Sequence, residues 1–194
     1  YKAFWHKLGE GAYQSGEFRR RHKDGRDIWI LASYNPILDA AGHPFKVVKF
    51  ATDVTSEKLR NAEYEGQIAA ISRSQAMISF TREGIILDAN ENFLRTTGYS
   101  AAEVVGKHHR MFVSPDYAQS KEYASFWKEL GDGKHTSAIY QRYGKSGNPI
   151  WLQATYNPIF DASGRLIKIT KFATNVTQNM KSRQTAIAAA EETL

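Results

Sequence analysis

The chain has 194 residues, with 26 basic against 20 acidic side chains, a formal charge of +6 and no cysteine. A chain of this length forms one large domain or two small ones. The lack of cysteine excludes a disulfide framework, thiolate-ligated zinc, iron–sulfur clusters, a cysteine nucleophile and any chromophore that needs a cysteinyl adduct. No apolar run approaches the roughly 20 residues that cross a bilayer, so the cytoplasm is the expected location.

The positive charge is spread along the chain, and its only dense cluster is Arg19–Lys23. We expect these residues on an extended strand, where successive side chains point to opposite faces of the sheet. They therefore make no single basic surface, and we expect neither nucleic-acid binding nor membrane contact from this part of the protein.

The chain repeats itself. Residues Tyr1–Thr55 align without a gap with Tyr123–Thr177, and about half of the paired positions are identical. Each residue matches the one 122 positions later, as Tyr34-Asn35-Pro36-Ile37 matches Tyr156-Asn157-Pro158-Ile159. A period this long indicates a domain duplication rather than a solenoid.

The second copy has a leader, about residues 76–122, that has no counterpart before Tyr1. We therefore expect residues 1–55 to be the C-terminal part of a first domain whose N-terminal part is missing. Residues 76–177 are expected to be a complete second domain. A half domain exposes its core face unless another chain covers it.

The second copy alternates between strand and helix signals. The capping-box spacing of Ser100 and Glu103 marks a short helix, and Gly131 is expected to close the longest one. The order β-β-α-α-α-β-β-β predicts an α+β fold, an antiparallel sheet with helices on one face. Strands are predicted at 76–81, 84–89, 137–143, 150–159 and 166–176, and helices at 90–97, 100–103 and 120–130.

Two further segments are predicted to be helical. The connector 56–75 has no proline and one glycine, and it carries Tyr64, Ile68 and Ile71 at four-then-three spacing. The tail 178–194 carries Met180, Ile187 and Leu194 seven apart. Each pattern fits either a coiled-coil seam or a helix that packs on its own domain, because too few heptads are present to decide.

Several ordered motifs together resemble the PAS family. They include Asp88–Phe93, Thr97-Gly98-Tyr99, Asn157-Pro158-Ile159 and the final strand that ends at Thr177. The repeat and its Glu- and Lys-rich connector are most similar to the sensory region of soluble chemotaxis-type transducers, which include the biofilm-dispersion regulators.

The resemblance implies a sensor and not an enzyme. It implies two PAS-like domains that hold a small ligand or cofactor, act as a homodimer, and pass a signal to a downstream methyl-accepting domain and its chemotaxis kinase and adaptor complex. The runner-up is the sensor region of a histidine kinase or cyclic-dinucleotide enzyme. A ligand-free dimerisation scaffold is a third interpretation. The sequence contains no Gly-rich phosphate loop, His-Glu-x-x-His motif or nucleophile elbow.

An Asp-x-Thr motif couples the last strand to the next helix in many family members. The first copy has Asp53-Val54-Thr55, whereas the second has Asn175-Val176-Thr177. Asparagine forms hydrogen bonds but no ion pair, so charge-assisted coupling is open to question in the second copy.

The resemblance also suggests cofactors. Haem is the first candidate, because some PAS sensors bind its iron through a histidine in the region of His108 and His109; the alternative is a polar helix end with one solvated imidazole. No other metal is expected. Flavin (FAD) is less favoured, because Val113-Ser114-Pro115-Asp116 keeps only half of an Arg-His-Pro-Asp pattern, and Thr136 stands where an aromatic ring is expected.

Trp151 and Asn157 complete the set of candidate site residues. An aromatic ring beside a polar amide is typical of a pocket wall. The alternative for Trp151 is ordinary core packing.

Overall fold

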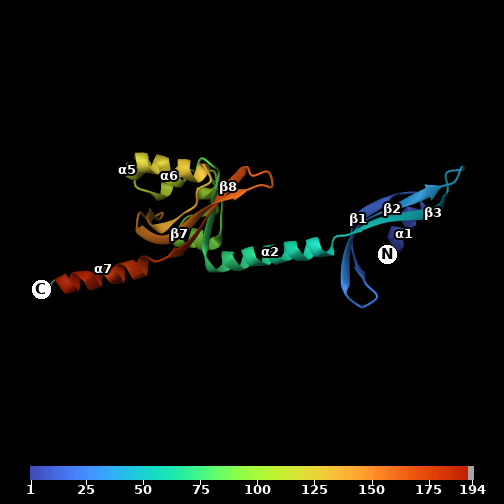
Figure 1. Cartoon of the computed structure of the whole chain (residues 1–194), viewed down its shortest axis with the longest axis horizontal. Coiled ribbons are helices and arrows are strands. Elements are labelled where there is room, and N and C mark those ends of the chain that lie inside the picture. Colours follow the sequence, from blue (N-terminus) through green and yellow to red (C-terminus); the bar gives the residue numbers. More distant parts are fainter. Residues whose placement is uncertain (192–194) are drawn as a thin grey trace. The chain divides into compact units, whose positions relative to one another are not determined.

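The computed structural model describes residues 1–191 and divides into two compact units. Unit 1 is Tyr1–Ile68 and unit 2 is Ala69–Leu194. The boundary falls inside helix α2 (Thr55–Ser74), which occupies the connector predicted to be helical (Figure 1). We describe each unit by itself.

Unit 1 is a three-stranded antiparallel sheet with one helix against it. Along β2, Ile30, Ala32 and Tyr34 are buried on one face, where they pack with Leu8 of the helix. This period of two is what a sheet covered on one face requires. The elements are α1 (Lys2–Gly9), β1 (Gln14–Arg21), β2 (Asp27–Leu38) and β3 (Pro44–Asp53), with strand order β1-β2-β3.

Unit 2 contains a five-stranded antiparallel sheet of order β5-β4-β8-β7-β6. Its last three strands are joined by two hairpin turns, in which Gly147 and Gly164 take the left-handed conformation that glycine tolerates. The strands are β4 (Ala76–Phe80), β5 (Ile86–Ala89), β6 (Thr136–Tyr143), β7 (Pro149–Phe160) and β8 (Leu166–Asn175).

The helices that cover the sheet of unit 2 lie between β5 and β6 in the chain. The predicted capping box is confirmed: the backbone N–H and hydroxyl of Ser100 both donate to the Glu103 carboxylate. The elements are α3 (Glu91–Thr97), α4 (Ala101–Val104), the 3-10 helix η1 (His109–Phe112), α5 (Pro115–Ala118) and α6 (Lys121–Gly131).

Two sequence predictions about these helices were wrong. The region holds four α-helices and one 3-10 helix instead of three helices, because α5 is a single turn too short to show a period. Ser114 caps it, and Pro115 at its first position needs no intrahelical hydrogen bond. Gly131 is the last residue of α6 and not its terminator, whereas Gly133 takes the left-handed conformation.

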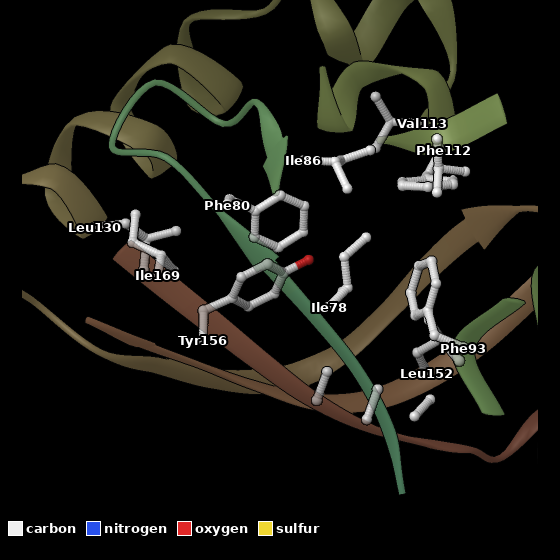
Figure 2. Close-up of a cluster of buried hydrophobic side chains, with 14 of the residues drawn as sticks. Ile78, Phe80, Ile86, Phe93, Phe112, Val113, Leu130, Leu152, Tyr156 and Ile169 are labelled. Atoms are coloured by element: carbon white, nitrogen blue, oxygen red, sulfur yellow. The ribbon is translucent and has the colours of Figure 1, made fainter. Parts of the chain in front are cut away.

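The core of unit 2 lies on the helix-covered face of its sheet. Ile150, Leu152, Ala154 and Tyr156 are buried at alternate positions of β7. Figure 2 shows Tyr156 among Phe80, Ile78 and other buried side chains, with its hydroxyl in the interior. Alternation along the strand sends the odd-numbered residues of β7 to the opposite face.

Helix α2 has no buried residue, and Tyr64, Ile68 and Ile71 are exposed on it. On α7 (Thr177–Glu191), Ile187 is exposed, while Leu194 of the predicted seam lies outside the described residues. Pairing of either helix with a second chain therefore stays a prediction. Among the described helices, none combines the length and the apolar character needed to span a membrane.

Candidate functional site

His109 lies at the centre of unit 2 and is 1% exposed. The Nδ1 atom is 2.9 Å from the hydroxyl of Tyr123 on α6. The Nε2 atom is 3.1 Å from the hydroxyl of Tyr156 on β7. One imidazole therefore connects η1, the long helix and the sheet.

Two cations extend this arrangement across the sheet. Arg142 on β6 is 4% exposed, and its Nη2 donates to the Tyr156 hydroxyl at 3.2 Å. Lys171 on β8 is 1% exposed and pairs directly with Tyr156 in the strand register. The Lys171 ammonium lies 4.9 Å from the centre of the Tyr156 ring, a cation–π contact. We call His109, Tyr123, Arg142, Tyr156 and Lys171 the buried polar network.

The hydrogen bonds admit a proton arrangement that runs in one direction through the network. In it, the Tyr156 oxygen accepts from Arg142, and its own O–H donates to Nε2 of His109. A neutral imidazole that accepts at Nε2 carries its proton on Nδ1, and that N–H donates to Tyr123. The network is then a directed chain from Arg142 to Tyr123.

Electrostatics agree with a neutral His109. Burial lowers its pKa well below the ordinary value, and the positive charges of Arg142, Lys171 and His108 lower it further. Burial likewise lowers the pKa of Lys171 well below its ordinary value, and Arg142 adds to this effect. Within the described residues, no acidic group offsets either shift, so burial disfavours the charged form of both side chains.

Aromatic rings surround the network. Phe80, Phe112, Phe126 and Trp127 all lie within 6.5 Å of His109, centre to centre. Two polar atoms in this wall are buried without a hydrogen-bond partner: Nε of Arg142 and Nε1 of Trp127. A cavity of about 380 Å³ lies alongside, bordered by Tyr117, Phe126 and Thr136.

The structure does not bring all four predicted site residues together. His109 is in the network, and the half-buried His108 caps η1 by accepting from the backbone N–H of Arg110 at 3.1 Å. Trp151 and Asn157 lie on the opposite face of β7, away from the core. There Asn157 donates to the hydroxyl of Thr155 at 3.1 Å. Trp151 is out of phase with the buried residues of β7, so it lines no pocket with His109.

The residues present do not fit haem at His109. Both ring nitrogens are hydrogen-bonded to tyrosine hydroxyls, which leaves no lone pair for iron. The adjacent cavity is bordered by neither His108 nor His109. For flavin, the segment with the partial Arg-His-Pro-Asp pattern serves as the cap and first turn of α5. No cluster of three metal-ligating side chains occurs in the residues that the structure describes.

Sequence reasoning missed four of the five network residues: Tyr123, Arg142, Tyr156 and Lys171. The signal was present in the repeat, because Arg20, Tyr34 and Lys49 stand 122 positions earlier than Arg142, Tyr156 and Lys171. A second signal was the phase of β8, in which Lys171 shares its face with Ile169 and Ala173.

The predicted coupling motifs both lie where a last strand enters a helix. The backbone N–H of Trp151 donates to Thr177 Oγ1 at 2.9 Å, and the N–H of Thr177 donates to Asn175 Oδ1 at 3.0 Å. In unit 1, Trp29, Thr55 and Asp53 make the same two hydrogen bonds at 2.8 and 2.9 Å. Asn175 thus reproduces the hydrogen bond of Asp53 without its charge.

Comparison with known proteins gives consistent results. A family model described as the PAS fold matches residues 1–51 and 86–173. Biofilm dispersion protein BdlA of Pseudomonas aeruginosa is 40% identical over 184 residues, which is 95% of this chain and 44% of that protein. The aerotaxis receptor of Escherichia coli K12 is 30% identical over 77 residues, 40% of this chain and 15% of the receptor.

Among solved structures, a light-oxygen-voltage domain studied with a flavin analogue matches with a TM-score of 0.51 and 21% identity. It covers 65% of this chain and 96% of that domain, and at this identity it shows the fold alone. The chain spans less than half of the length of the curated relatives named above. With its α+β architecture, antiparallel sheet and covering helices, the chain belongs to the PAS fold family.

Proposed function

We propose that the chain is the sensory region of a chemotaxis-type receptor. In this proposal unit 2 senses a small ligand through the buried polar network, and α7 carries the response onward. The similarity to the biofilm dispersion protein and to the aerotaxis receptor supports the class of receptor. A homodimer in the cytoplasm, with a methyl-accepting domain and its kinase and adaptor complex downstream, completes the proposal.

One observation carries the proposal: the network and the start of α7 share two strands. On β7, Tyr156 belongs to the network, and Trp151 donates its N–H to Thr177. On β8, Lys171 belongs to the network, and Asn175 accepts from the N–H of Thr177. Five residues of strand span about 17 Å, so a shift of β7 at Tyr156 reaches the helix start directly.

The start of α7 is the bistable element in this proposal. A ligand shifts an equilibrium only by its difference in affinity for the two states. One hydrogen bond contributes about 1 kcal/mol, which changes a two-state ratio about fivefold. Making or breaking the bond between Trp151 and Thr177 therefore suffices for a signal.

Repetition supports the proposed tandem organisation. Strands β1, β2 and β3 pair in the register of β6, β7 and β8: Gln14 faces Tyr34 as Thr136 faces Tyr156. We propose that residues 1–55 are the C-terminal part of one PAS domain and residues 76–177 are a complete second one. Residues 56–75 and 178–194 are then helical connectors.

A chimera tests this function. This chain replaces the matching segment of the Pseudomonas aeruginosa biofilm dispersion protein, and biofilm dispersion is measured. We expect the chimera to support dispersion and Thr177→Val to abolish it. Thr185→Val is the matched control, because that exposed hydroxyl contacts only the Lys181 carbonyl of its own helix. Dispersion that Thr177→Val leaves unchanged contradicts the proposal.

A further inference from the structure

The buried polar network lacks a negative partner. Arg142 and Lys171 lie on the two strands that flank β7, and both are more than nine-tenths buried. Burying an unpaired charge is strongly unfavourable, so folded proteins either pair such a group or disfavour its charged form, as burial does for Lys171 here. The residues that the structure describes place no carboxylate within salt-bridge distance of either cation.

The N–H groups of the interior that make no hydrogen bond have a specific geometry. Arg142 uses Nη1 for the Gln141 carbonyl and Nη2 for the Tyr156 hydroxyl, while its Nε–H is buried without a partner. Trp127 offers a second buried N–H, which lies near the Tyr123 hydroxyl but makes no well-formed hydrogen bond. A guanidinium with a free N–H suits a planar, two-oxygen acceptor, which is the geometry of a carboxylate.

We propose that unit 2 binds a small carboxylate, whose charged group pairs with Arg142 and Lys171 beneath the helices. This inference rests on the proposed sensory function and names the class of ligand. The carboxylate supplies the missing counterion and accepts from Nε of Arg142. The surrounding aromatic rings accommodate a flat apolar body.

The cavity beside the network provides the approach. Phe126 borders the cavity and packs edge-on against Tyr156, with ring centres 5.0 Å apart. Thr136 also borders it and lies 3.1 Å from the Tyr140 hydroxyl, and the Arg142 guanidinium lies over the Tyr140 ring. Tyr140 therefore stands between the cavity and Arg142, and in this proposal the ligand reaches the interior by displacing the Phe126 ring.

The rim of the cavity carries both signs of charge. Glu122 and Glu129 face Lys134 and His135 there, and Glu129 lies 3.7 Å from Lys134. The rim therefore provides no strong selection for an anion. Selection for an anion therefore depends on the interior, where the network contains basic side chains and tyrosines and no carboxylate.

Nuclear magnetic resonance of the whole chain tests the proposal. Sodium benzoate and sodium acetate are the probes, with benzamide as the uncharged match for benzoate and sodium chloride as the ionic control. We expect a carboxylate probe to shift the Nε–H resonance of Arg142 and the Nε1–H resonance of Trp127. Arg142→Lys and Trp127→Phe assign the two signals.

Three results overturn the proposal. The first is that neither carboxylate shifts the two N–H resonances at about 10 mM, a concentration tenfold above a Kd of about 1 mM. Another is an equal shift with benzamide, which indicates apolar binding only. The last is an equal shift with chloride, which indicates a simple anion site.

Lys171→Met provides a variant that keeps the shape and removes the charge. We expect its benzoate Kd to rise at least about tenfold, because a hydrogen-bonded charge is lost. Its unliganded Tm should equal or exceed that of the wild type, because a costly buried charge is gone. Lys49→Met is the matched control, since Lys49 is the exposed equivalent in unit 1. A lower Tm with an unchanged Kd assigns Lys171 a structural role and overturns the proposal.

Failure of this inference is distinguishable from failure of the sensory function. If no carboxylate binds while changes in the network still loosen the start of α7, only the ligand class is wrong. If benzoate binds and the start of α7 does not respond, the ligand class stands and the coupling is wrong.

Discussion

The two units carry the same Arg–Tyr–Lys triad in different surroundings. Arg20 donates to the Tyr34 hydroxyl at 3.3 Å, as Arg142 does to Tyr156 at 3.2 Å. The lysine ammonium lies 5.2 Å from the tyrosine ring centre in unit 1 and 4.9 Å from it in unit 2. Arg20 and Lys49 are exposed, whereas the helices of unit 2 bury their equivalents.

The difference teaches that burial, more than residue identity, sets the chemistry of the triad. For Tyr34, burial raises the pKa, but hydrogen bonds and charge from Arg20 and Lys49 outweigh it, and the net pKa is lowered. For Tyr156, burial dominates and raises the pKa despite the nearby Arg142. The tyrosine is buried in both units, whereas its arginine and lysine partners are exposed in unit 1 and buried in unit 2.

The largest expected contrast concerns the tryptophans of the covering helices. Trp127 on α6 is 8% exposed, whereas its equivalent Trp5 on α1 is 43% exposed. Trp127→Ala should cost about 3–5 kcal/mol of unfolding free energy, and Trp5→Ala about 1 kcal/mol or less. Urea unfolding followed by far-ultraviolet circular dichroism measures both. Equal losses contradict the contrast in burial.

The tyrosine hydroxyls give the next contrast. Tyr156→Phe leaves buried Arg142 and His109 without a partner and should cost about 1–3 kcal/mol. Tyr34→Phe removes a contact with the exposed Arg20 and should cost about 0.5 kcal/mol or less. Urea titration of the two variants measures both losses of unfolding free energy. A Tyr156→Phe protein as stable as the wild type is incompatible with a tightly bonded network.

Acid should destabilise unit 2 through His109. Its folded-state pKa is depressed, so below the unfolded value of about 6.5 the unfolded chain binds a proton that the folded chain does not. Stability therefore falls with pH below about 6.5, by up to about 1.4 kcal/mol per pH unit. The test is the difference in pH dependence between wild type and His109→Gln. Identical slopes from pH 7 to 5 argue against a buried neutral imidazole.

The strand-to-helix junctions should give the smallest contrast at neutral pH. Thr177→Val and Thr55→Val each remove a hydroxyl that accepts from the backbone N–H of a tryptophan. Each should cost about 1 kcal/mol of unfolding free energy. Low pH should distinguish the two junctions, because only one of them contains a carboxylate. Hydrogen bonds from the hydroxyl and the backbone N–H of Thr55 lower the pKa of Asp53, so its contribution is lost as pH falls below about 4.

Amide exchange of Thr55 and Thr177 measures this separation. Protection of the Thr55 amide should fall in acid while that of Thr177 persists, because Asn175 does not titrate. Asp53→Asn should abolish the difference. Parallel loss at both amides shows that the Asp53 carboxylate has no special role.

Local signals predicted much of the fold. The predicted bounds of the long strands are right to within a residue or two, and the capping-box spacing placed α4. Single-turn α5 lacks a period and was missed. These features depend on neighbours in sequence, and a sequence displays such neighbours directly.

The site was harder to predict because it depends on which face of each strand is covered. His109 was identified, but as a haem ligand, and both its nitrogens are hydrogen-bonded to tyrosines. Trp151 and Asn157 were placed in the pocket although Leu152 and Ala154 set the opposite phase for β7. Arg142 and Lys171 resemble surface residues in sequence, and only long-range packing buries them.

The most direct test of the account is hydrogen exchange at the Trp151 and Thr177 amides in Tyr156→Phe. Val104→Ala is the control, because it removes a fully buried side chain outside the network and lowers overall stability alone. If the network is coupled to α7, Tyr156→Phe will accelerate exchange at these two amides more than Val104→Ala does at matched unfolding free energy. Equal acceleration in the two variants contradicts a signal that passes from the core along β7 and β8.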